Sequence, residues 1–447
     1  MPEDRKHRPG AGGIAPALAL VTAALLAGCT DGGGPFATRS ATTVGDPAVA
    51  GTVAPRLDNK GTVQSDLIAS LLARRSVLPA GSSFATVAAS VLAASSGAAE
   101  AELRVARLTA KARSKNWLPS IGPNVSLSSL GSLAASLILD QAIFDNGRRK
   151  AERAFAAADV EVAAVTLASD LNQRVYEGLK LYIEAQRADE LSAVTETALA
   201  RMRDFDRIMS VRVKGGLSDR SEYRVIAQKL AEMEAMHSQE REAATTARAE
   251  LAAMTKGGLD GLSGLTTLPP DPGAPEPLSV LAARGEAART RAEVQVARAG
   301  LLPGFGGKAS VDRGGDLDGG LALDGEGLGF GRKDKLRALE EAENAALRRI
   351  DEADETARRR IVTLEREIAS LTAQEAEDSA LLRQMAANLD LFTAQYKAGR
   401  RTLIELVGQF ESYTRMQRDH ATLKYRITLA RLEIARERGV LVDGAAM

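Results

Sequence analysis

The sequence has little of what enzymes and metalloproteins use. Its 447 residues include one cysteine and three histidines, so an internal disulfide is excluded and a histidine-rich metal site is not expected. Lysine and arginine number 58, as do aspartate and glutamate, and a chain without excess positive charge is a poor candidate for general nucleic-acid binding. Aromatic residues make up only 4%, which suits long helices that meet along narrow seams. This composition points away from enzymes, and no cofactor or metal is expected.

The N-terminal residues have the pattern of an export signal. Three basic residues lie within residues 5–8, and the apolar stretch 14–26 is too short to span a bilayer. The stretch ends in Leu26-Ala27-Gly28-Cys29, which resembles a bacterial lipobox. This resemblance implies a signal peptide over 1–28 and a mature lipoprotein that begins at Cys29, held on a membrane by acyl chains such as palmitate. The alternative is an ordinary secretory signal with an incidental cysteine.

Loop-forming segments divide the rest of the chain. Residues 29–63 are rich in glycine, threonine, proline and alanine without periodicity, and we interpret them as an N-terminal tether. Five prolines within 257–277 exclude a helix there, so this segment is expected to link two halves. The halves are 64–256 and 278–438, and a short C-terminal tail follows at 439–447.

The two halves share their breakpoints at a constant offset of 184 residues. Prolines, glycines and hydroxyl residues that would end or begin elements recur at this distance, although the residues between them match poorly. Four breakpoints with one offset indicate a duplicated structural unit. The matched positions are Leu118-Pro119 with Leu302-Pro303, Gly147-Arg148 with Gly331-Arg332, Gly215 with Gly399, and Ser218 with Thr402.

Each half is expected to contain one very long helix and a shorter return helix. The long helices are 148–212 and 332–396, each about 98 Å long at 1.5 Å per residue. The return helices are 218–256 and 402–438. Apolar residues of the second long helix follow the 3-4 repeat of a coiled coil. They are Leu336, Leu339, Ala346, Ile350, Ala353, Ala357, Ile361, Leu364, Ile368, Leu371, Leu382, Met385, Leu389, Phe392 and Tyr396.

Tight turns are expected between the long helices and their return helices. Gly215 and Gly399 would end the long helices, because glycine adopts the left-handed conformation without steric cost. Ser218 and Thr402 are the expected N-caps of the return helices. Thr402 is followed three residues later by Glu405, which fits a capping box.

Two non-helical segments, 119–143 and 303–330, interrupt the helical pattern. Each has room for two strands of about 9–11 residues and a turn, the strand length that crosses a bilayer in a tilted β-barrel. Apolar and polar residues alternate in the first segment, whereas glycine dominates the second. Four strands cannot close a barrel, and open strand edges in lipid would leave backbone groups unpaired. If these strands span a membrane, several chains must therefore share one barrel.

Two motifs at these breakpoints resemble a known family. Residues 396–405, Tyr-Lys-Ala-Gly-Arg-Arg-Thr-Leu-Ile-Glu, are similar to the periplasmic tip turn of the TolC-like outer-membrane channels. Residues 144–148, Phe-Asp-Asn-Gly-Arg, are similar to the junction between the first barrel hairpin and its helix. The resemblance covers 64–438 and implies a mainly α fold with a small β part. In that fold, very long antiparallel coiled-coil helices accompany two β-hairpins per chain, which contribute to a shared trimeric twelve-stranded barrel.

The family resemblance also implies partners and a location. It implies a homotrimer in the lipid of the outer membrane whose helical tunnel extends into the periplasm. There the tunnel would meet a periplasmic adaptor (membrane fusion) protein and an inner-membrane pump or ABC transporter. The chain would passively conduct substrates in efflux or type I secretion. The alternative is a periplasmic coiled-coil adaptor or scaffold lipoprotein without a pore, which the presence of a strand pair in each half disfavours.

Gate residues follow from the same resemblance. Tyr396 and Arg401 look like the tip residues that hold the family's tunnel closed. Their acidic partner from the first repeat would fall on Ser221, which cannot form that ion pair. Asp219 and Glu222 are close enough in sequence to substitute for it.

One acidic position is expected to line the tunnel constriction. Glu405 matches it, so three copies would form a ring that attracts cations, whereas the family's next acidic position falls on Gly408. Simpler roles remain open for these residues. Glu405 could cap its helix, Tyr396 could complete the coiled-coil seam, and Arg401 could be a solvated turn residue.

Overall fold

The structure is a computed structural model, and its contacts divide the chain into Met1–Gly51 and Thr52–Met447. The described residues are 55–58, 61–127, 133–256, 259, 261–269, 274–312, 316–324 and 331–446. All of them belong to the second unit. The predicted signal peptide and Cys29 lie outside the described residues.

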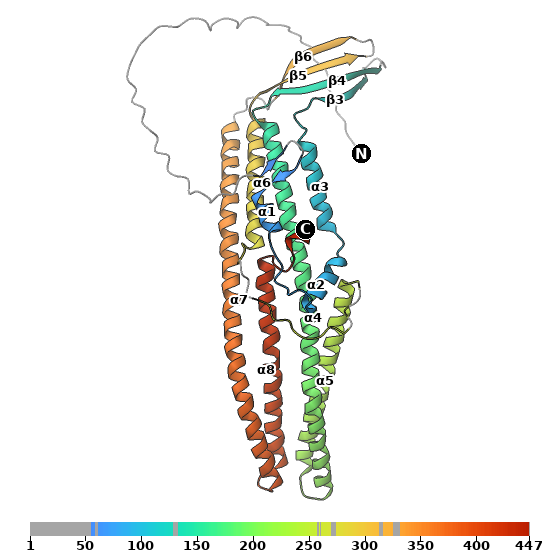
Figure 1. Ribbon diagram of the computed structural model, residues 1–447, viewed down its shortest axis with the longest axis vertical. Coiled ribbons are helices and arrows are strands. Elements are labelled where there is room, and N and C mark those ends of the chain that lie inside the picture. Colours follow the sequence, from blue (N-terminus) through green and yellow to red (C-terminus); the bar gives the residue numbers. More distant parts are fainter. Residues whose placement is uncertain are drawn as a thin grey trace, which may run out of the picture. The chain divides into compact units, whose positions relative to one another are not determined.

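Each half contributes helices that flank a pair of strands. The first half contains β1 (Arg56–Leu57), β2 (Val63–Gln64), α1 (Asp66–Leu72), α2 (Ser83–Ala93), α3 (Ala98–Arg113), β3 (Ser120–Leu127), β4 (Leu133–Phe144), α4 (Arg148–Lys214) and α5 (Arg220–Met254). The second half contains α6 (Leu278–Gly300), β5 (Gly304–Asp312), β6 (Leu317–Asp324), α7 (Arg332–Lys397) and α8 (Leu403–Glu437), followed by a short 3₁₀ turn (Gly444–Ala446). Within this unit, the strands lie at one end of the long helices and the α4–α5 and α7–α8 turns at the other (Figure 1).

The element bounds repeat with the offset read from the sequence. β3 and β5 begin at Ser120 and Gly304, and β4 and β6 begin at Leu133 and Leu317. The same 184-residue distance separates the first residues of α4 and α7. The segment expected to be a tether ends differently, because its last described residues form the small β1–β2 pair. Of the second predicted hairpin, residues 325–330 lie outside the described part of the chain.

The four longer strands form one antiparallel sheet in the order β3-β4-β5-β6, so β4 and β5 join the two halves. Pairing places the large apolar residues of all four strands on one face, because Ile121 lies opposite Leu139 and Leu137 lies opposite Val311. The Gly-rich second hairpin shares this pattern. Its contribution to the apolar face consists of Phe305, Val311, Leu317, Leu321 and Leu323, all exposed.

The other face of the sheet is mainly polar. Asp140 lies opposite Ser120 on one side and Lys308 on the other, and its carboxylate is 3.9 Å from the Lys308 ammonium. Ser310 lies opposite Asp318, and Ile138 is a large apolar exception on this face. A sheet with one apolar and one polar face has the pattern of a strand wall between lipid and water.

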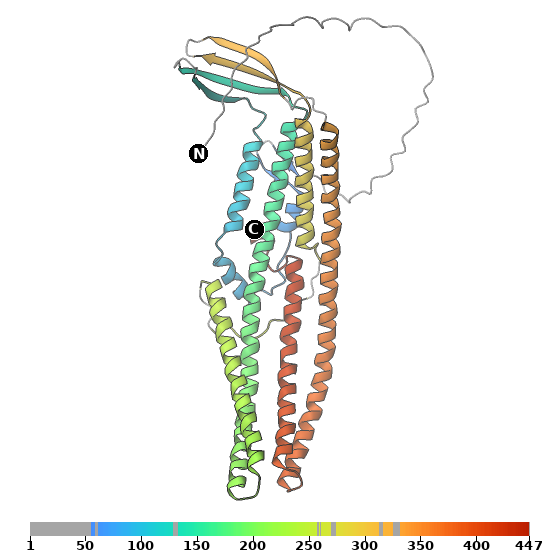
Figure 2. The ribbon, with the colours of Figure 1, turned by 180° about the vertical axis from the view of Figure 1, so that it is seen from behind.

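The helices pack as an antiparallel bundle in which α4 is central. It contacts α1, α2, α3, α5, α6 and α8, whereas α7 contacts mainly α6 and α8 (Figure 2). The coiled-coil prediction is confirmed, because all fifteen predicted seam residues of α7 are buried or half-buried. Within the described residues, no single helix has the length and apolar character to cross a bilayer. Helices α2 and α3 meet those criteria only as a pair, with a 60° bend between them.

In the middle of the bundle, hydrogen bonds connect segments that are distant in sequence. Arg74, which follows α1 and is buried, donates hydrogen bonds to the carbonyl oxygens of Arg438 (2.6 Å) and Glu276 (2.8 Å). Its guanidinium therefore connects the N-terminal helices with the segment between the halves and with the C-terminal end of α8. Ser65 caps α1 and donates a hydrogen bond to the buried carboxyl of Glu161 on α4.

Gly178 on α4 allows α2 to approach closely. A Cβ at this position would lie 2.6 Å from Val91 Cγ2, and the branched valine cannot swing away cheaply. We therefore expect Gly178→Ala to lower the free energy of unfolding by about 1–3 kcal/mol through overpacking. Thermal unfolding followed by circular dichroism measures this. Gly408→Ala is the matched control, because its Cβ meets nothing within 4 Å. It should gain about 0.5–1 kcal/mol from helix propensity. Equal midpoints for both variants would contradict the close approach.

Candidate functional site

The turn between α4 and α5 differs by one residue from the sequence prediction. Gly215 has φ −83° and is not left-handed; the left-handed residue is Gly216, with φ 70°. The turn is closed by hydrogen bonds from Leu217 N to Arg212 O (2.8 Å) and from Gly216 N to Val213 O (3.1 Å). This pattern is a Schellman motif, which satisfies the last helical carbonyls. The prediction that Gly215 takes the left-handed conformation was wrong, because α4 ends at Lys214, two residues beyond the predicted end at 212, and Gly215 becomes its C-cap.

The N-cap of α5 shifts by the same residue. Ser218 is not the cap; its hydroxyl accepts a hydrogen bond from Arg212 Nε at 3.0 Å. Asp219 has extended backbone angles and accepts from Ser221 N at 3.3 Å, so it caps the helix. Asp219 therefore aligns with Thr402 at an offset of 183, not 184.

The turn between α7 and α8 agrees with the sequence prediction. Gly399 has φ 74°, and its amide and that of Arg400 donate to the carbonyls of Tyr396 and Gln395, both at 2.9 Å. Thr402 and Glu405 form the predicted capping box. The Glu405 carboxylate accepts from Thr402 N at 2.9 Å. Both tip turns are thus Schellman motifs followed by a capped helix.

Arg401 is held by its own turn. Its guanidinium donates to Gln395 Oε1 and to Glu405 Oε1, each at 3.1 Å, and lies 4.8 Å from the centre of the Phe392 ring. These contacts connect the end of α7 with the start of α8. Arg401 is therefore not simply a solvated turn residue.

Within one chain, the proposed acidic substitutes do not meet the predicted gate pair. No hydrogen bond or ion pair among the described residues joins Asp219 or Glu222 to Tyr396 or Arg401. Asp219 is engaged as a helix cap, and Tyr396 packs half-buried against the apolar cluster near the tip. An ionic contact between the two tip turns is absent from this chain's described contacts.

An aromatic contact that the sequence did not reveal joins the two helical hairpins just behind the tip. Phe205 on α4 and Phe410 on α8 meet edge to face with ring centres 5.6 Å apart. The guanidinium of Arg201 lies 5.7 and 5.2 Å from these two ring centres and donates to Thr393 Oγ1 on α7 at 3.1 Å. We call Arg201, Phe205, Thr393 and Phe410 the hairpin latch. Its members are far apart in sequence, so no local pattern identifies it.

The opposite end of α4 is shaped by the second motif. Asn146 and Gly147 are both left-handed, with φ 53° and 82°, and turn the chain from β4 into α4. The Asp145 carboxylate accepts from the amides of Gly147 (3.0 Å) and Arg149 (2.9 Å), which caps the helix. Asn146 Nδ2 donates to the carbonyl of Pro303 at 2.9 Å and so ties the first hairpin to the second.

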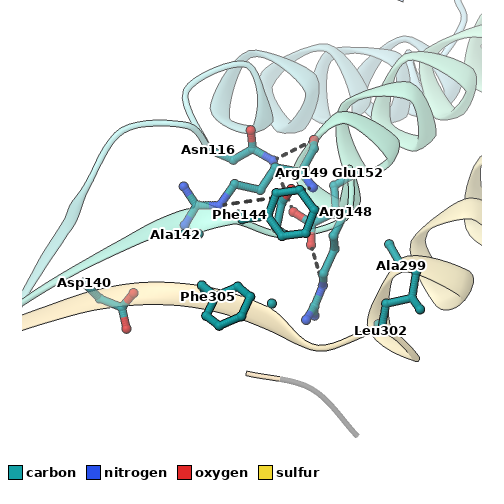
Figure 3. A pocket seen from close by; sticks show the side chains of 13 residues that line it. Asn116, Asp140, Ala142, Phe144, Arg148, Arg149, Glu152, Ala299, Leu302 and Phe305 are labelled. Carbon is teal, nitrogen blue, oxygen red and sulfur yellow. Dashed lines mark hydrogen bonds and ion pairs between the residues drawn. The ribbon is translucent and has the colours of Figure 1, made fainter. Parts of the chain in front are cut away.

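A pocket of 310 Å³ lies at this junction (Figure 3). Phe144 and Phe305 border it, and the side chain of Arg148 extends from its helix into the space beside Phe305 and Leu302 (Figure 3). Arg148 is neutralised by Glu152, whose carboxylate is 3.3 Å away. The charged residues that line the pocket are largely paired within the chain, which indicates a structural joint and not a ligand site.

The fold, with its strand wall, long helices and capped tip turns, is similar to that of solved membrane proteins. A membrane protein from Pseudomonas aeruginosa matches at TM-score 0.73 and 15% identity, over 83% of this chain and 92% of that chain. The outer membrane protein VceC from Vibrio cholerae matches at TM-score 0.70 and 18% identity, over 80% and 96%. The CmeC outer membrane channel of Campylobacter jejuni matches at TM-score 0.67 and 12% identity, over 81% and 86%.

These similarities define the class of fold. The chain has the fold of the outer-membrane channels, with long helices attached to a small sheet. More particularly, the TolC-like fold predicted from the sequence motifs is confirmed. No family model matches the sequence, and no curated protein matches it. At these identities the likeness concerns the fold.

The capping carboxylate makes the second tip turn sensitive to acid. The hydrogen bond from the Thr402 amide, and then those from Arg401 and the Thr402 hydroxyl, lower the pKa of Glu405 below its usual 4.5. Because the folded-state pKa is the lower one, the stabilisation is present above pH 4.5 and is lost as pH falls through the folded pKa. We expect hydrogen exchange of residues 399–405, corrected for intrinsic rates, to accelerate only below pH 4.5. In Glu405→Gln it should be faster at pH 7 and show no acid step, whereas Glu377→Gln should behave as wild type. An acid step that persists in Glu405→Gln would contradict this assignment.

Proposed function

We propose that this chain is the outer-membrane channel component of a tripartite efflux pump or a type I secretion system. It would passively conduct substrates from an inner-membrane transporter through a trimeric periplasmic tunnel. The observation that carries the proposal is the four-stranded sheet with one apolar and one polar face at the end of very long helices. Solved outer-membrane channels with the same fold support it.

The sheet has the chemistry of a wall between lipid and water. Its strands have 8–12 residues, close to the length that crosses a bilayer at a tilt. The apolar face would meet acyl chains, and the polar face with Asp140 and Lys308 would meet the aqueous lumen. Three chains would supply the twelve strands of one barrel. The chain itself would do no chemistry, and the driving force would come from its partner.

The partners and the location belong to the same proposal. The protein would be a homotrimer in the outer membrane, anchored by acyl chains on Cys29, with its tip docked to a periplasmic adaptor protein and an inner-membrane pump or ABC transporter. Three copies of Glu405 would form a cation-attracting ring at the constriction. The turns around Gly215 and Gly399 would be the moving parts. Across a boundary between chains, Asp219 or Glu222 would be the acidic partner of Tyr396 and Arg401.

A periplasmic scaffold without a pore is the weaker function. Such a scaffold would have no need for two strand pairs whose large apolar residues, Ile138 apart, lie on one face, where Ile121, Leu137 and Leu321 are exposed. Exposed apolar patches of this kind mark an interaction surface for lipid or protein. The sheet therefore favours the channel.

Purified protein in planar lipid bilayers should form channels that stay mostly closed. Arg401→Ala should raise the conductance and the open fraction, because Arg401 connects α7 with α8 across the second tip turn. Arg400→Ala is the matched control, since it removes the same charge from the same turn but no side-chain hydrogen bond or ion pair to a described residue. Unchanged closure in Arg401→Ala would remove Arg401 from the gate. Absence of conductance in all variants would contradict the channel.

The hairpin latch should contribute separately to the closed state. Phe410→Ala removes an aromatic ring that is almost fully buried, at a cost of about 3–5 kcal/mol in packing. We expect the α7–α8 hairpin to separate from α4 and the open fraction to rise. Phe84→Ala controls for lost stability, because Phe84 is equally buried but packs on Tyr182, away from the tip. If both variants raise the open fraction of the channel equally, the hairpin latch has no specific role in gating.

A further inference from the structure

Exposed aromatic side chains are confined to one level of the molecule. Within the part of the chain that the structure describes, they are Trp117, Phe144 and Phe305, which are 58%, 55% and 47% exposed. All three lie where the sheet meets the helices, since Trp117 lies between α3 and β3, Phe144 ends β4 and Phe305 is the second residue of β5. Aromatic rings concentrate at the boundary between hydrocarbon and headgroups in membrane proteins. These rings therefore mark the level at which such a boundary would cross the chain.

The same level is rich in basic residues. The end of α3 and the beginnings of α4 and α7, residues 111–115, 148–153 and 332–337, contain eleven basic and two acidic residues, although the whole chain is neutral. The helix dipole disfavours cations in the first turn of a helix, so the basic beginnings of α4 and α7 do not stabilise these helices by themselves. An anionic partner at this level would account for their position.

Only part of this positive charge is neutralised within the chain. The carboxylate of Glu152 lies 3.3 Å from both Arg113 and Arg148. Three exposed lysines at this level, however, form no ion pair or side-chain hydrogen bond with another described residue. We call them the junction lysines, and they are Lys115, Lys150 and Lys333.

Contacts between α3, α4 and the sheet fix the level of these groups in the first repeat. The side-chain amide of Asn116 donates a hydrogen bond to the carbonyl oxygen of Arg149 at 3.0 Å. Gln141 on β4 donates a hydrogen bond to the carbonyl oxygen of Trp117 at 3.1 Å. Lys115 and Trp117, which flank Asn116, are therefore held beside the beginning of α4.

The second repeat places Lys333 at the corresponding position. Lys333 is the second residue of α7, as Arg149 is of α4, and the two are separated by the repeat offset of 184 residues. Six helical residues rise about 9 Å. The headgroup layer on one side of a bilayer is about 5–8 Å thick. The basic segments therefore have the depth of one headgroup layer directly beside the strands.

We infer that the junction lysines bind the phosphate groups of anionic phospholipids, with the three exposed aromatic rings beside the adjoining acyl chains. This inference rests on the proposed function, because it takes the sheet to lie in a bilayer, and it adds a preference for lipid of negative charge. Phospholipid suits both parts of the surface, since its phosphate complements ammonium groups and its acyl chains complement exposed rings. A free phosphate ion would engage only the lysines, and acidic side chains of another protein would leave the rings in water.

The single tryptophan of the sequence gives a direct readout of the lipid at this level. Full-length protein is reconstituted in vesicles of equal parts phosphatidylglycerol and phosphatidylcholine, in which one of the two lipids is brominated near the headgroup end of its acyl chains. Because Trp117 is the one tryptophan, its fluorescence reports the lipid beside the junction. Brominated phosphatidylglycerol should quench it about threefold more strongly than brominated phosphatidylcholine, since basic groups near a bilayer attract anionic lipid. High salt should weaken this preference.

Two triple variants assign the preference to particular lysines. The first replaces all three junction lysines with glutamine, and the two brominated lipids should quench it equally. The second is the matched control, which removes the same charge from three exposed lysines near the C-terminal ends of α4, α5 and α7 and should retain the preference. It combines Lys214→Gln, Lys256→Gln and Lys397→Gln.

The channel conductance of the same protein separates the possible failures. Equal or absent quenching in the wild type, or a preference that survives in the first triple variant, overturns the inference. Intact conductance would then leave the proposed function standing, whereas its absence would contradict the proposed function as well. Loss of the preference when inorganic phosphate replaces chloride at constant ionic strength would assign the lysines to free phosphate and also overturns the inference.

Discussion

Peptide N–H and C=O groups along the outer edges of β3 and β6 have no strand beside them in this four-stranded sheet. A water-exposed edge would be satisfied by solvent, but the apolar face of the same strands favours an environment without water. These two requirements conflict within a single chain, and the proposed barrel of several copies would satisfy both. The long helices depend on the same sheet, because α4 follows β4 and α7 follows β6 directly in the chain.

Much of the fold could be predicted from the sequence because the duplication is marked by residues with strict backbone demands. Proline ends a helix, and glycine permits left-handed turns, so the offset of 184 residues located the strands and the starts of α4 and α7 correctly. The coiled-coil seam of α7 followed from periodicity alone. The second hairpin looked weak because its glycines obscured the alternation. Strand pairing was needed to show that its apolar residues lie on the same face of the sheet as those of the first hairpin.

The tip could be predicted only in part. Gly215 and Gly216 are both able to end α4, and Ser218 and Asp219 are both good caps, so local chemistry does not decide between them. The length of α4 decides, since its 67 residues exceed those of α7 by one. The hairpin latch was missed for a different reason. Arg201 and Phe410 are remote in sequence, and their contact depends on how two helical hairpins pack, which no periodicity encodes.

The two long helices have nearly equal lengths but unequal surroundings. α4 has 26 buried residues and α7 only five, because α4 packs on six helices of its own chain and α7 mainly on two. If the duplicated units had identical environments, their burial would match. The acidic segment 338–355 of α7 pairs with α6 through Glu343 and Arg291, and its other acidic residues Glu341, Asp351 and Glu352 are exposed. In the proposed oligomer α7 would lie at the boundary of the chain, and another copy would supply the neighbours that α4 finds within its own chain.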